Sequence, residues 1–311
     1  MVSLRIQSLM IRFALLSIVS GCATDSTHND SVETKVLLIG IDGIRPDVLA
    51  EVHTPTLDSL AAHGTFTAHA QTGYPSVSGP GWSSFLTGVW SDKHGVTNNE
   101  FEGKNYEAYP DIFTRIEQVA PELETFVVAD WLPLVTDDHN GPVISDQVDT
   151  KRIFDGYELG WLEADEESVR AAEHALATGN PDAMFVYLGN PDETSHHFES
   201  IGAEYRSAIE TADHHVERLI RAIVHRPSFG NEDWLILVST DHGRRADGGH
   251  GGDTDEERTI FYIASGPSAT VGLAPDTTYI VDLPVTALEH LGVEIDPSWG
   301  LDGKVVGLRS N

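Results

Sequence analysis

Cysteine and basic residues are both scarce in this sequence. Its single cysteine, Cys22, excludes an intrachain disulfide. The 19 Lys and Arg residues are outnumbered by 49 Asp and Glu, which gives a formal net charge of −30 at pH 7. Binding to a nucleic-acid backbone needs clustered Lys and Arg to displace counterions, and the sequence contains no such cluster. Duplex nucleic acid is therefore not expected as a partner. A small phosphorylated substrate stays open, because bound metal ions can dominate the charge of a local site.

Long apolar runs are also lacking, and the most pronounced one lies close to the N-terminus. Arg5 and Arg12 precede the apolar residues 13–19, and small residues follow. A basic start, a short apolar core and a small-residue cleavage site are typical of an export signal. The run is too short for a membrane-spanning helix, which needs about 20 apolar residues.

The end of this run sets the expected domain boundaries. Residues 19–22, Val-Ser-Gly-Cys, resemble a bacterial lipobox, in which the cysteine becomes lipidated. We expect residues 1–22 to be a lipoprotein signal peptide, 23–34 a polar tether, and 35–311 a single α/β domain. Cys22 would then anchor the protein to a membrane in the bacterial periplasm. A plain export signal with an incidental cysteine is the alternative.

Strand-like and helix-like segments alternate along the rest of the chain. Short runs rich in Val, Ile, Leu or aromatic residues occupy 36–41, 125–129, 184–188, 234–238 and 259–263. Apolar residues recur at three-to-four spacing in 55–62, 111–119, 163–176, 203–224 and 283–291. This alternation predicts an α/β fold with a central, mostly parallel sheet and helices on both faces. The weakly periodic stretch 131–160, rich in Asp, Gly and Pro, is expected to form a loop or a small cap.

Three of the strand-like runs are followed by an aspartate. Asp42 directly follows the first run, Asp192 follows the run 184–188, and Asp241 follows the run 234–238. The carboxyl ends of parallel strands share one edge of an open sheet, and ligands bind at that edge. We therefore expect the three carboxylates to lie close together, although the segments that carry them are far apart in sequence.

Histidines accompany two of these aspartates. His196 follows Asp192 by four residues, so the two side chains would share one face of a helix. His242 is adjacent to Asp241, a pair that either shares one ion at a strand-to-loop break or serves two ions. His250 lies between pairs of glycines, which give the backbone freedom. A lone Asp after a strand would indicate only a turn or cap, but the whole set predicts a metal site. Carboxylate and imidazole ligands suit zinc, with manganese or iron as alternatives.

A serine-rich stretch, 74–88, offers a nucleophile. Small residues allow close approach of a ligand, and the apolar pattern that follows favours a helix. A hydroxyl at a helix start meets free N–H groups and the positive end of the dipole, which favours phosphate. Serine needs a base or a metal to lose its proton. The spacing leaves both Ser76 and Ser78 open, and an ordinary Ser-rich turn is the alternative.

Together these motifs resemble the alkaline phosphatase superfamily, most closely its nucleotide pyrophosphatase/phosphodiesterase branch, over about residues 35–307. The matching segments are Ile41-Asp42-Gly43, Pro75-Ser76-Val77-Ser78-Gly79-Pro80, Thr87-Gly88, His94-Gly95, Asn99, Pro191-Asp192-Glu193-Thr194-Ser195-His196, Thr240-Asp241-His242-Gly243 and His250. The resemblance implies an alkaline-phosphatase-like three-layer sandwich. Ser78 replaces the usual threonine of the branch, and Gly81-Trp82 replaces an Asn-His pair, which implies a different substrate wall.

The resemblance also implies a two-metal hydrolase of phosphate esters. Ser78 falls on the nucleophile position, where it would form a covalent phospho-enzyme, and Asn99 on a position that holds a phosphate oxygen. The implied ligand sets are Asp42, Asp241 and His242, with Ser78, for one ion and Asp192, His196 and His250 for the other. Zinc is the expected metal and manganese the alternative.

A phosphodiesterase or nucleotide pyrophosphatase is the expected activity. A monoester carries about two negative charges at neutral pH, and no Lys or Arg lies between Arg45 and Lys93 to compensate the extra charge near Ser78. A basic side chain from elsewhere, such as Arg244 or Arg245, would instead favour a phosphomonoesterase. A sulfatase is disfavoured, because its nucleophile needs a following Pro and Arg. The last alternative is a metal-binding lipoprotein without turnover, against which the hydroxyl at the nucleophile position argues.

Overall fold

The computed structural model describes residues 32–137 and 140–309. The predicted signal peptide, its cysteine and most of the predicted tether lie outside these residues. The predicted end of the tether is corrected: Glu33 and Thr34 belong to β1 (Glu33–Ile41) and pair with Glu232 and Asp233 of β6 (Glu232–Ser239). The domain therefore begins at Glu33 rather than at residue 35, because sheet pairing extends beyond the apolar part of the strand.

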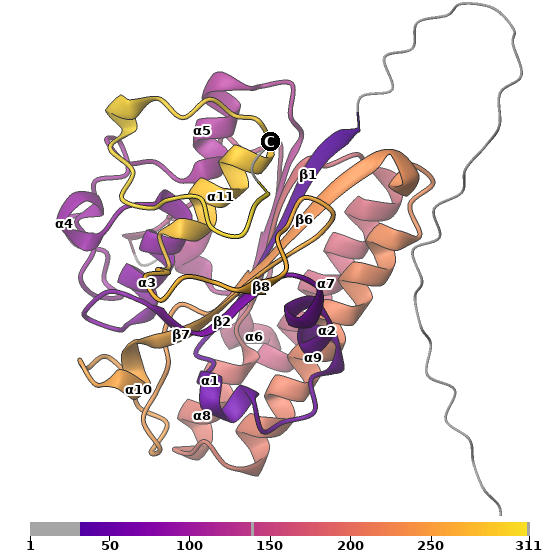
Figure 1. Cartoon of the computed structure of the whole chain (residues 1–311). Coiled ribbons are helices and arrows are strands. Elements are labelled where there is room, and N and C mark those ends of the chain that lie inside the picture. Colours follow the sequence, from indigo (N-terminus) through magenta and orange to yellow (C-terminus); the bar gives the residue numbers. More distant parts are fainter. Residues whose placement is uncertain (1–31, 138–139, 310–311) are drawn as a thin grey trace, which may run out of the picture. The chain divides into compact units, whose positions relative to one another are not determined.

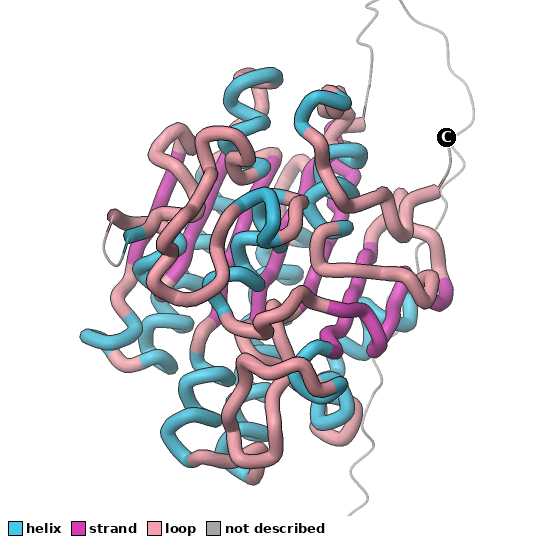
Figure 2. Tube along the Cα trace, turned by 90° about the vertical axis from the view of Figure 1, so that its left-hand side faces the viewer, coloured by secondary structure: helices cyan, strands magenta, loops and turns pink. Residues whose placement is uncertain are grey.

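An eight-stranded sheet forms the centre of the described domain, in the order β4-β3-β5-β1-β6-β7-β2-β8. The other strands are β2 (Thr65–Gln71), β3 (Thr125–Ala129), β4 (Thr150–Ile153), β5 (Ala183–Leu188), β7 (Thr259–Ser265) and β8 (Gly272–Leu273). Figure 2 shows the strands side by side. β7 runs antiparallel to β6 and β2, and the other paired strands run parallel. The predicted mostly parallel sheet is confirmed.

Helices cover the sheet on both faces (Figure 1), which confirms the predicted three-layer sandwich. Helices α3 (Ser78–Thr87), α4 (Ser91–His94), α5 (Ile112–Val119) and α11 (Asp282–His290) lie on one side. Helices α2 (Pro55–His63), α7 (Trp161–Thr178) and α9 (Ala203–Val224) lie on the other. The remaining helices are α1 (Pro46–Leu49), α6 (Gly156–Leu159), α8 (Asn190–Phe198) and α10 (Asp255–Arg258). Among the described helices, none is long and apolar enough to cross a membrane.

The central strand β1 is buried on both faces. Val36 and Leu38 pack into one hydrophobic cluster, whereas Leu37, Ile39 and Ile41 pack into the cluster on the opposite face. For this reason, a strand that is covered by helices on both sides has apolar residues at consecutive positions. Each such buried side chain stabilises the fold by roughly 1.5–3 kcal/mol. The strand therefore gives the residue that follows it a rigid support.

The described part of 131–160 belongs to the main domain and is not a separate cap. Strand β4 extends the sheet by parallel pairing with β3. Leu134, Val143 and Ile144 are buried in the same core cluster as Val36. The sequence Thr-Lys-Arg-Ile of β4 has no apolar period, because an edge strand is partly exposed and often carries charge. The described residues between η1 (Leu132–Leu134) and β4 are mostly loop, as expected, whereas 150–153 form an edge strand of the sheet.

Candidate functional site

The three predicted aspartates gather at one edge of the sheet. Strand β1 lies between β5 and β6 in parallel register. Asp42 directly follows β1, Asp241 follows β6 after one intervening residue, and Asp192 lies in the first turn of α8, just after β5. The carboxyl ends of three neighbouring strands thus deliver the three carboxylates, as the alternating pattern predicts.

Asp42, Asp241 and His242 form a group that we call the buried cluster. All three side chains are almost inaccessible to solvent. His242 Nε2 lies 3.5 Å from Asp42 Oδ1 and 3.3 Å from Asp241 Oδ2. Among the described residues, neither of these oxygens has a hydrogen-bond partner. A buried carboxylate oxygen without a partner is unfavourable, and the three ligand atoms are close enough to hold one ion. The buried cluster therefore fits a divalent cation.

The other oxygen of Asp42 is held by two aromatic side chains. Trp82 Nε1 donates to Asp42 Oδ2 at 2.8 Å, and the Tyr187 hydroxyl donates to the same atom at 2.6 Å. Trp82 is fully buried against β1, where a Cβ at Gly40 would lie only 2.4 Å from its ring. The side chain of Trp82 is therefore not exposed to a substrate, and its indole positions Asp42. The sequence feature that indicates this contact is Gly40, because a glycine among large apolar residues of a strand leaves room for a neighbouring side chain.

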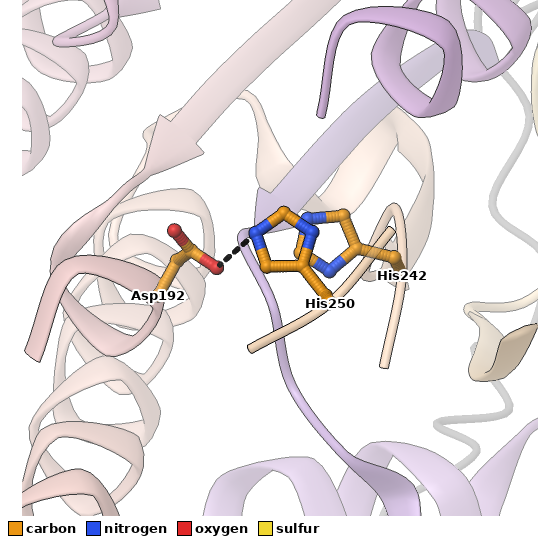
Figure 3. A group of neighbouring side chains, drawn as sticks. All are labelled: Asp192, His242 and His250. Atoms are coloured by element: carbon orange, nitrogen blue, oxygen red, sulfur yellow. Dashed lines mark ion pairs between the residues drawn. The ribbon is translucent and has the colours of Figure 1, made fainter. Parts of the chain in front are cut away.

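Asp192, His196 and His250 form the open cluster. His196 Nε2 lies 3.2 Å from Asp192 Oδ2 and 2.9 Å from His250 Nε2. His250 Nε2 lies 3.8 Å from Asp192 Oδ1, the ion pair drawn in Figure 3. The side chain of His196 is 41% exposed. Spacing by four residues on α8 brings Asp192 and His196 to one face of the helix, as predicted.

His242 connects the two clusters. Its ring stacks on His250 with centroids 3.8 Å apart and an interplanar angle of 17° (Figure 3). Ligand atoms of Asp192, His242 and His250 are also close enough together to hold one ion. The adjacent residues Asp241 and His242 both lie in the buried cluster, at the break after β6. The second of them also reaches toward the open cluster.

Ser78 is the predicted nucleophile that faces the buried cluster. It is the first residue of α3, and its Oγ lies 3.3 Å from His242 Nε2. The Ser76 hydroxyl instead donates to the carbonyl oxygen of Gly252 at 2.8 Å. The structure thus separates two serines that the spacing leaves open.

Asn99 lies beside the start of α3. Its Oδ1 accepts a hydrogen bond from the Gly79 N–H at 2.7 Å, and the residue is exposed. This bond uses the amide oxygen and fixes the plane of the amide. Nδ2 is then the atom that can donate to a ligand next to Ser78.

Burial and the crowding of negative charge shift the pKa values of the three residues of the buried cluster. Burial, followed by the charge of Asp192, raises the pKa of Asp42 to about 7. Burial and the neighbouring Asp42 also raise the pKa of Asp241 well above its usual value. Burial lowers the pKa of His242, which keeps the ring in the neutral form that binds metals. A bound cation would relieve the repulsion between the carboxylates.

Asp192 behaves differently from the other two aspartates. Burial alone would raise the pKa of Asp192, but the charge of Arg244 and the hydrogen bond from His196 outweigh it and hold the pKa well below its usual range. Arg244 is fully buried and pairs with Asp192 Oδ1. Sequence reasoning considers Arg244 only as a partner for substrate charge and misses this contact.

A serine at a helix start, next to buried carboxylates and imidazoles, is an arrangement that suits metal-assisted hydrolysis. The chain matches the type I phosphodiesterase / nucleotide pyrophosphatase family over residues 36–246 and belongs to that family. The resemblance to the nucleotide pyrophosphatase/phosphodiesterase branch inferred from the motifs is thereby confirmed.

Curated relatives are similar in sequence to this chain over 75% of its length. GPI ethanolamine phosphate transferase 1 of Candida glabrata is 24% identical over 258 residues, which cover 75% of this chain and 27% of the relative. Bis(5'-adenosyl)-triphosphatase ENPP4 of Bos taurus is 21% identical over 244 residues, which cover 75% of this chain and 53% of the relative. The matched region thus spans about a quarter to a half of the length of these two relatives.

Solved structures show the same fold at low sequence identity. An inactive form of murine ectonucleotide pyrophosphatase/phosphodiesterase 5, solved in complex with AMP, aligns with a TM-score of 0.66 and 14% identity, covering 85% of this chain and 96% of that chain. A 2-O GAG sulfatase aligns with a TM-score of 0.68 and 14% identity, covering 88% of this chain and 73% of that chain. The expected alkaline-phosphatase-like fold is confirmed.

Proposed function

We propose that this protein is a phosphodiesterase or nucleotide pyrophosphatase that acts through a covalent phospho-Ser78 intermediate. The observation that carries the proposal is the position of Ser78, whose Oγ lies at the start of α3 and 3.3 Å from His242 Nε2. A ten-residue helix begins there. Its first N–H groups and its dipole favour a negatively charged phosphate at the same point.

The two clusters contain the ligand types that two divalent ions require. The buried cluster, together with Ser78 Oγ, would hold one ion, and the open cluster would hold the other. Carboxylates and imidazoles suit zinc, with manganese as the alternative. Bound ions would supply positive charge that lowers the pKa of the Ser78 hydroxyl and offsets the charge of the phosphate.

The side chains then divide the reaction into two displacements. Ser78 Oγ, whose proton passes to solvent, attacks phosphorus, the bond from phosphorus to the leaving oxygen breaks, and that oxygen takes up a proton from solvent. Water then hydrolyses the phosphoserine ester and restores the hydroxyl. Nδ2 of Asn99 and the N–H of Ser78 would donate to the non-bridging oxygens, where negative charge develops. The hydrogen bond from Gly79 pre-sets the Asn99 amide for this role.

The two basic residues that would favour a monoester are already paired. Arg244 is fully buried, with its guanidinium against Asp192 and backbone carbonyl oxygens. Arg245 pairs with Glu257 and Asp247. Neither is positioned to neutralise the second charge of a monoester. This supports a substrate with a single negative charge on phosphorus, which is a diester.

The test compares kcat/KM for an aryl phosphate diester and the matching monoester, with the same metal and pH. A hydrogen bond to a charged group contributes about 1.5–3 kcal/mol, and the second charge of a monoester lacks such a partner, so we expect the diester to react roughly 10- to 100-fold better. A preference for the monoester would make the phosphomonoesterase the correct function. Absence of turnover on both esters with zinc or manganese would favour the non-catalytic metal-binding protein.

We also propose that the protein is anchored in the bacterial periplasm through a lipid on Cys22, in either the inner or the outer membrane. The support comes from the sequence, in which a short apolar run ends in a lipobox-like motif. Mass spectrometry of the mature wild-type protein should find acyl chains on Cys22, and Cys22→Ala should move the protein out of the membrane fraction or leave it unprocessed. A mature N-terminus without lipid contradicts the anchor.

A further inference from the structure

A buried guanidinium joins the three turns that carry the proposed ligands. Arg244 is fully buried. Its Nε donates to the carbonyl oxygen of Gly43 at 2.8 Å, its Nη1 to that of Gly248 at 2.9 Å, and its Nη2 to Asp192 Oδ1. Gly43 follows the first ligand of the buried cluster, and Gly248 precedes His250. One side chain therefore contacts the turn after β1, the first turn of α8 and the glycine-rich loop.

The backbone is shaped to admit this side chain. Gly43 has a φ of +64°, and a Cβ there would lie 2.0 Å from Arg244 Nη2 and 2.4 Å from Asp192 Oδ1. The ring of Tyr205 lies 5.2 Å from the guanidinium carbon, and its hydroxyl donates to the carbonyl oxygen of Gly43 at 2.8 Å. The guanidinium is thus enclosed and has a single orientation.

This contact fixes the orientation of the Asp192 carboxylate toward the open cluster. Arg244 pairs with Oδ1, which also lies 3.8 Å from His250 Nε2, while Oδ2 lies 3.2 Å from His196 Nε2. A planar guanidinium fixes the position of a carboxylate more strictly than a point charge does. The hydrogen bond to Gly248 acts in the same way on the loop that carries His250.

We propose that Arg244 is a positioning residue for the open cluster: it holds Asp192 Oδ2 and the His250 loop in place for an ion. The proposal rests on the proposed function, because it assumes that the open cluster binds metal. Arg244 has two opposing effects on the affinity of the open cluster for a cation. The positive charge of Arg244 repels a cation, whereas its fixed geometry keeps the ligands together. We infer that the geometric effect is the larger one.

Zinc titration of the full-length protein, stripped with a chelator, tests this inference by calorimetry and elemental analysis. Arg244→Gln removes the charge and most donors, and Arg244→Lys keeps the charge but loses the planar group. The control is Arg206→Gln, since Arg206 is an arginine on α9 that pairs with Glu51. Loss of a partner that orients a metal ligand typically weakens binding by about 10- to 100-fold.

We expect both Arg244 variants to keep one zinc ion at near wild-type affinity and to bind the second about 10- to 100-fold more weakly. The control should bind both ions as the wild type does. Tighter binding of the second ion by Arg244→Gln would overturn the proposal and make Arg244 a competitor of the metal. An equal loss of both ions would also overturn it, because it would indicate general destabilisation. If Arg244→Gln does not fold, the zinc affinities of Arg244→Lys alone test the proposal.

Hydrogen exchange of the chelated protein separates this inference from the proposed function. Without metal, the amides of the turn after β1, of the start of α8 and of residues 248–250 should exchange faster in the Arg244 variants than in the wild type and the control. Unchanged exchange would show that Arg244 does not hold these turns. A wild-type protein that binds no zinc would overturn the proposed metal sites, whatever the exchange data show.

Discussion

The buried cluster and the open cluster contain the same residue types but differ in burial and in charge. In the buried cluster, two carboxylates and a neutral imidazole are enclosed, and among the described residues no lysine or arginine pairs with Asp42 or Asp241. In the open cluster, the single carboxylate already pairs with Arg244, and His196 is 41% exposed. The formal charge of the first group is therefore −2, and that of the second, with its arginine, is zero.

The supporting elements differ as well. Asp42 and Asp241 follow central strands whose side chains are packed on both faces, so the buried cluster is rigid before any ion binds. The open cluster depends on the first turn of a nine-residue helix and on a glycine-rich loop. Charge density and rigidity therefore both favour metal binding at the buried cluster. We expect the ion of the buried cluster to be held more tightly and that of the open cluster to exchange more easily.

The largest effect is expected at the nucleophile, which faces the buried cluster. Ser78→Ala keeps the backbone of α3 and removes only the oxygen, so turnover should fall by at least about a thousandfold with the fold and bound metal largely kept. Ser76→Ala should have a mild effect, because that hydroxyl bonds to backbone groups of the loop, the carbonyl oxygen of Gly252 and the N–H of Gly251. Steady-state kinetics and circular dichroism of both variants check this. The reverse pattern would place the nucleophile at Ser76.

The next largest effect is expected on the zinc content of the buried cluster when Asp42 is replaced. Asp42→Asn removes a buried negative charge, and zinc binding by the buried cluster should weaken by more than about 100-fold, since partners that merely orient a ligand already contribute 10- to 100-fold. Elemental analysis after dialysis should then find less metal than in the wild type. Unchanged zinc content would contradict the assignment of Asp42 as a ligand.

His196→Ala should be milder than Asp42→Asn. Its side chain is 41% exposed, so water can take the vacant ligand position. We expect about a tenfold loss of activity at low zinc and recovery as the zinc concentration rises. A titration of activity against free zinc measures this. A loss that excess zinc does not restore would make the two clusters equivalent in their dependence on histidine.

The smallest effect concerns stability and a pair of buried carboxyls beside the start of α8. Asp130 follows β3, Asp165 lies on α7, and both are buried. Asp165 Oδ1 accepts from the Gly189 N–H at 2.8 Å, at the start of α8, whereas the oxygens of Asp130 have no partner among the described residues. Burial raises the pKa of Asp165 to about 7, and burial with the charge of Asp165 raises the pKa of Asp130 well above its usual value.

The sign of the pH dependence follows from these shifts. Between about pH 4 and pH 7 the folded chain keeps protons that the unfolded chain has lost, so the free energy of unfolding falls as pH rises, by roughly 1.4 kcal/mol per pH unit for each such group. Asp130→Asn removes one of these groups and should make the fall shallower in chelated protein. Urea unfolding at pH 5, 6, 7 and 8 measures both slopes. Identical slopes would show that Asp130 does not hold a proton in the folded state.

Local patterns in the sequence determine most of the elements and the chemistry of the site. The helix predicted over 203–224 has those bounds in the structure, and the strand predicted over 125–129 does too. Both follow from the period of apolar residues, which is a property of neighbouring positions. The convergence of the aspartates also follows from sequence, because the carboxyl ends of neighbouring parallel strands share one edge.

Other features were decided by the tertiary structure alone. The edge strand β4 has no apolar period, and its position depends on pairing with β3. Trp82 and Arg244 reach Asp42 and Asp192 from 40 and 52 positions away in sequence. No local pattern encodes such contacts, because a buried hydrogen-bond donor is selected by the acceptor that folding brings beside it. The sequence by itself thus predicted the candidate ligands and a serine-rich segment for the nucleophile, whereas folding decided which serine faces the buried cluster and which groups hold each candidate ligand.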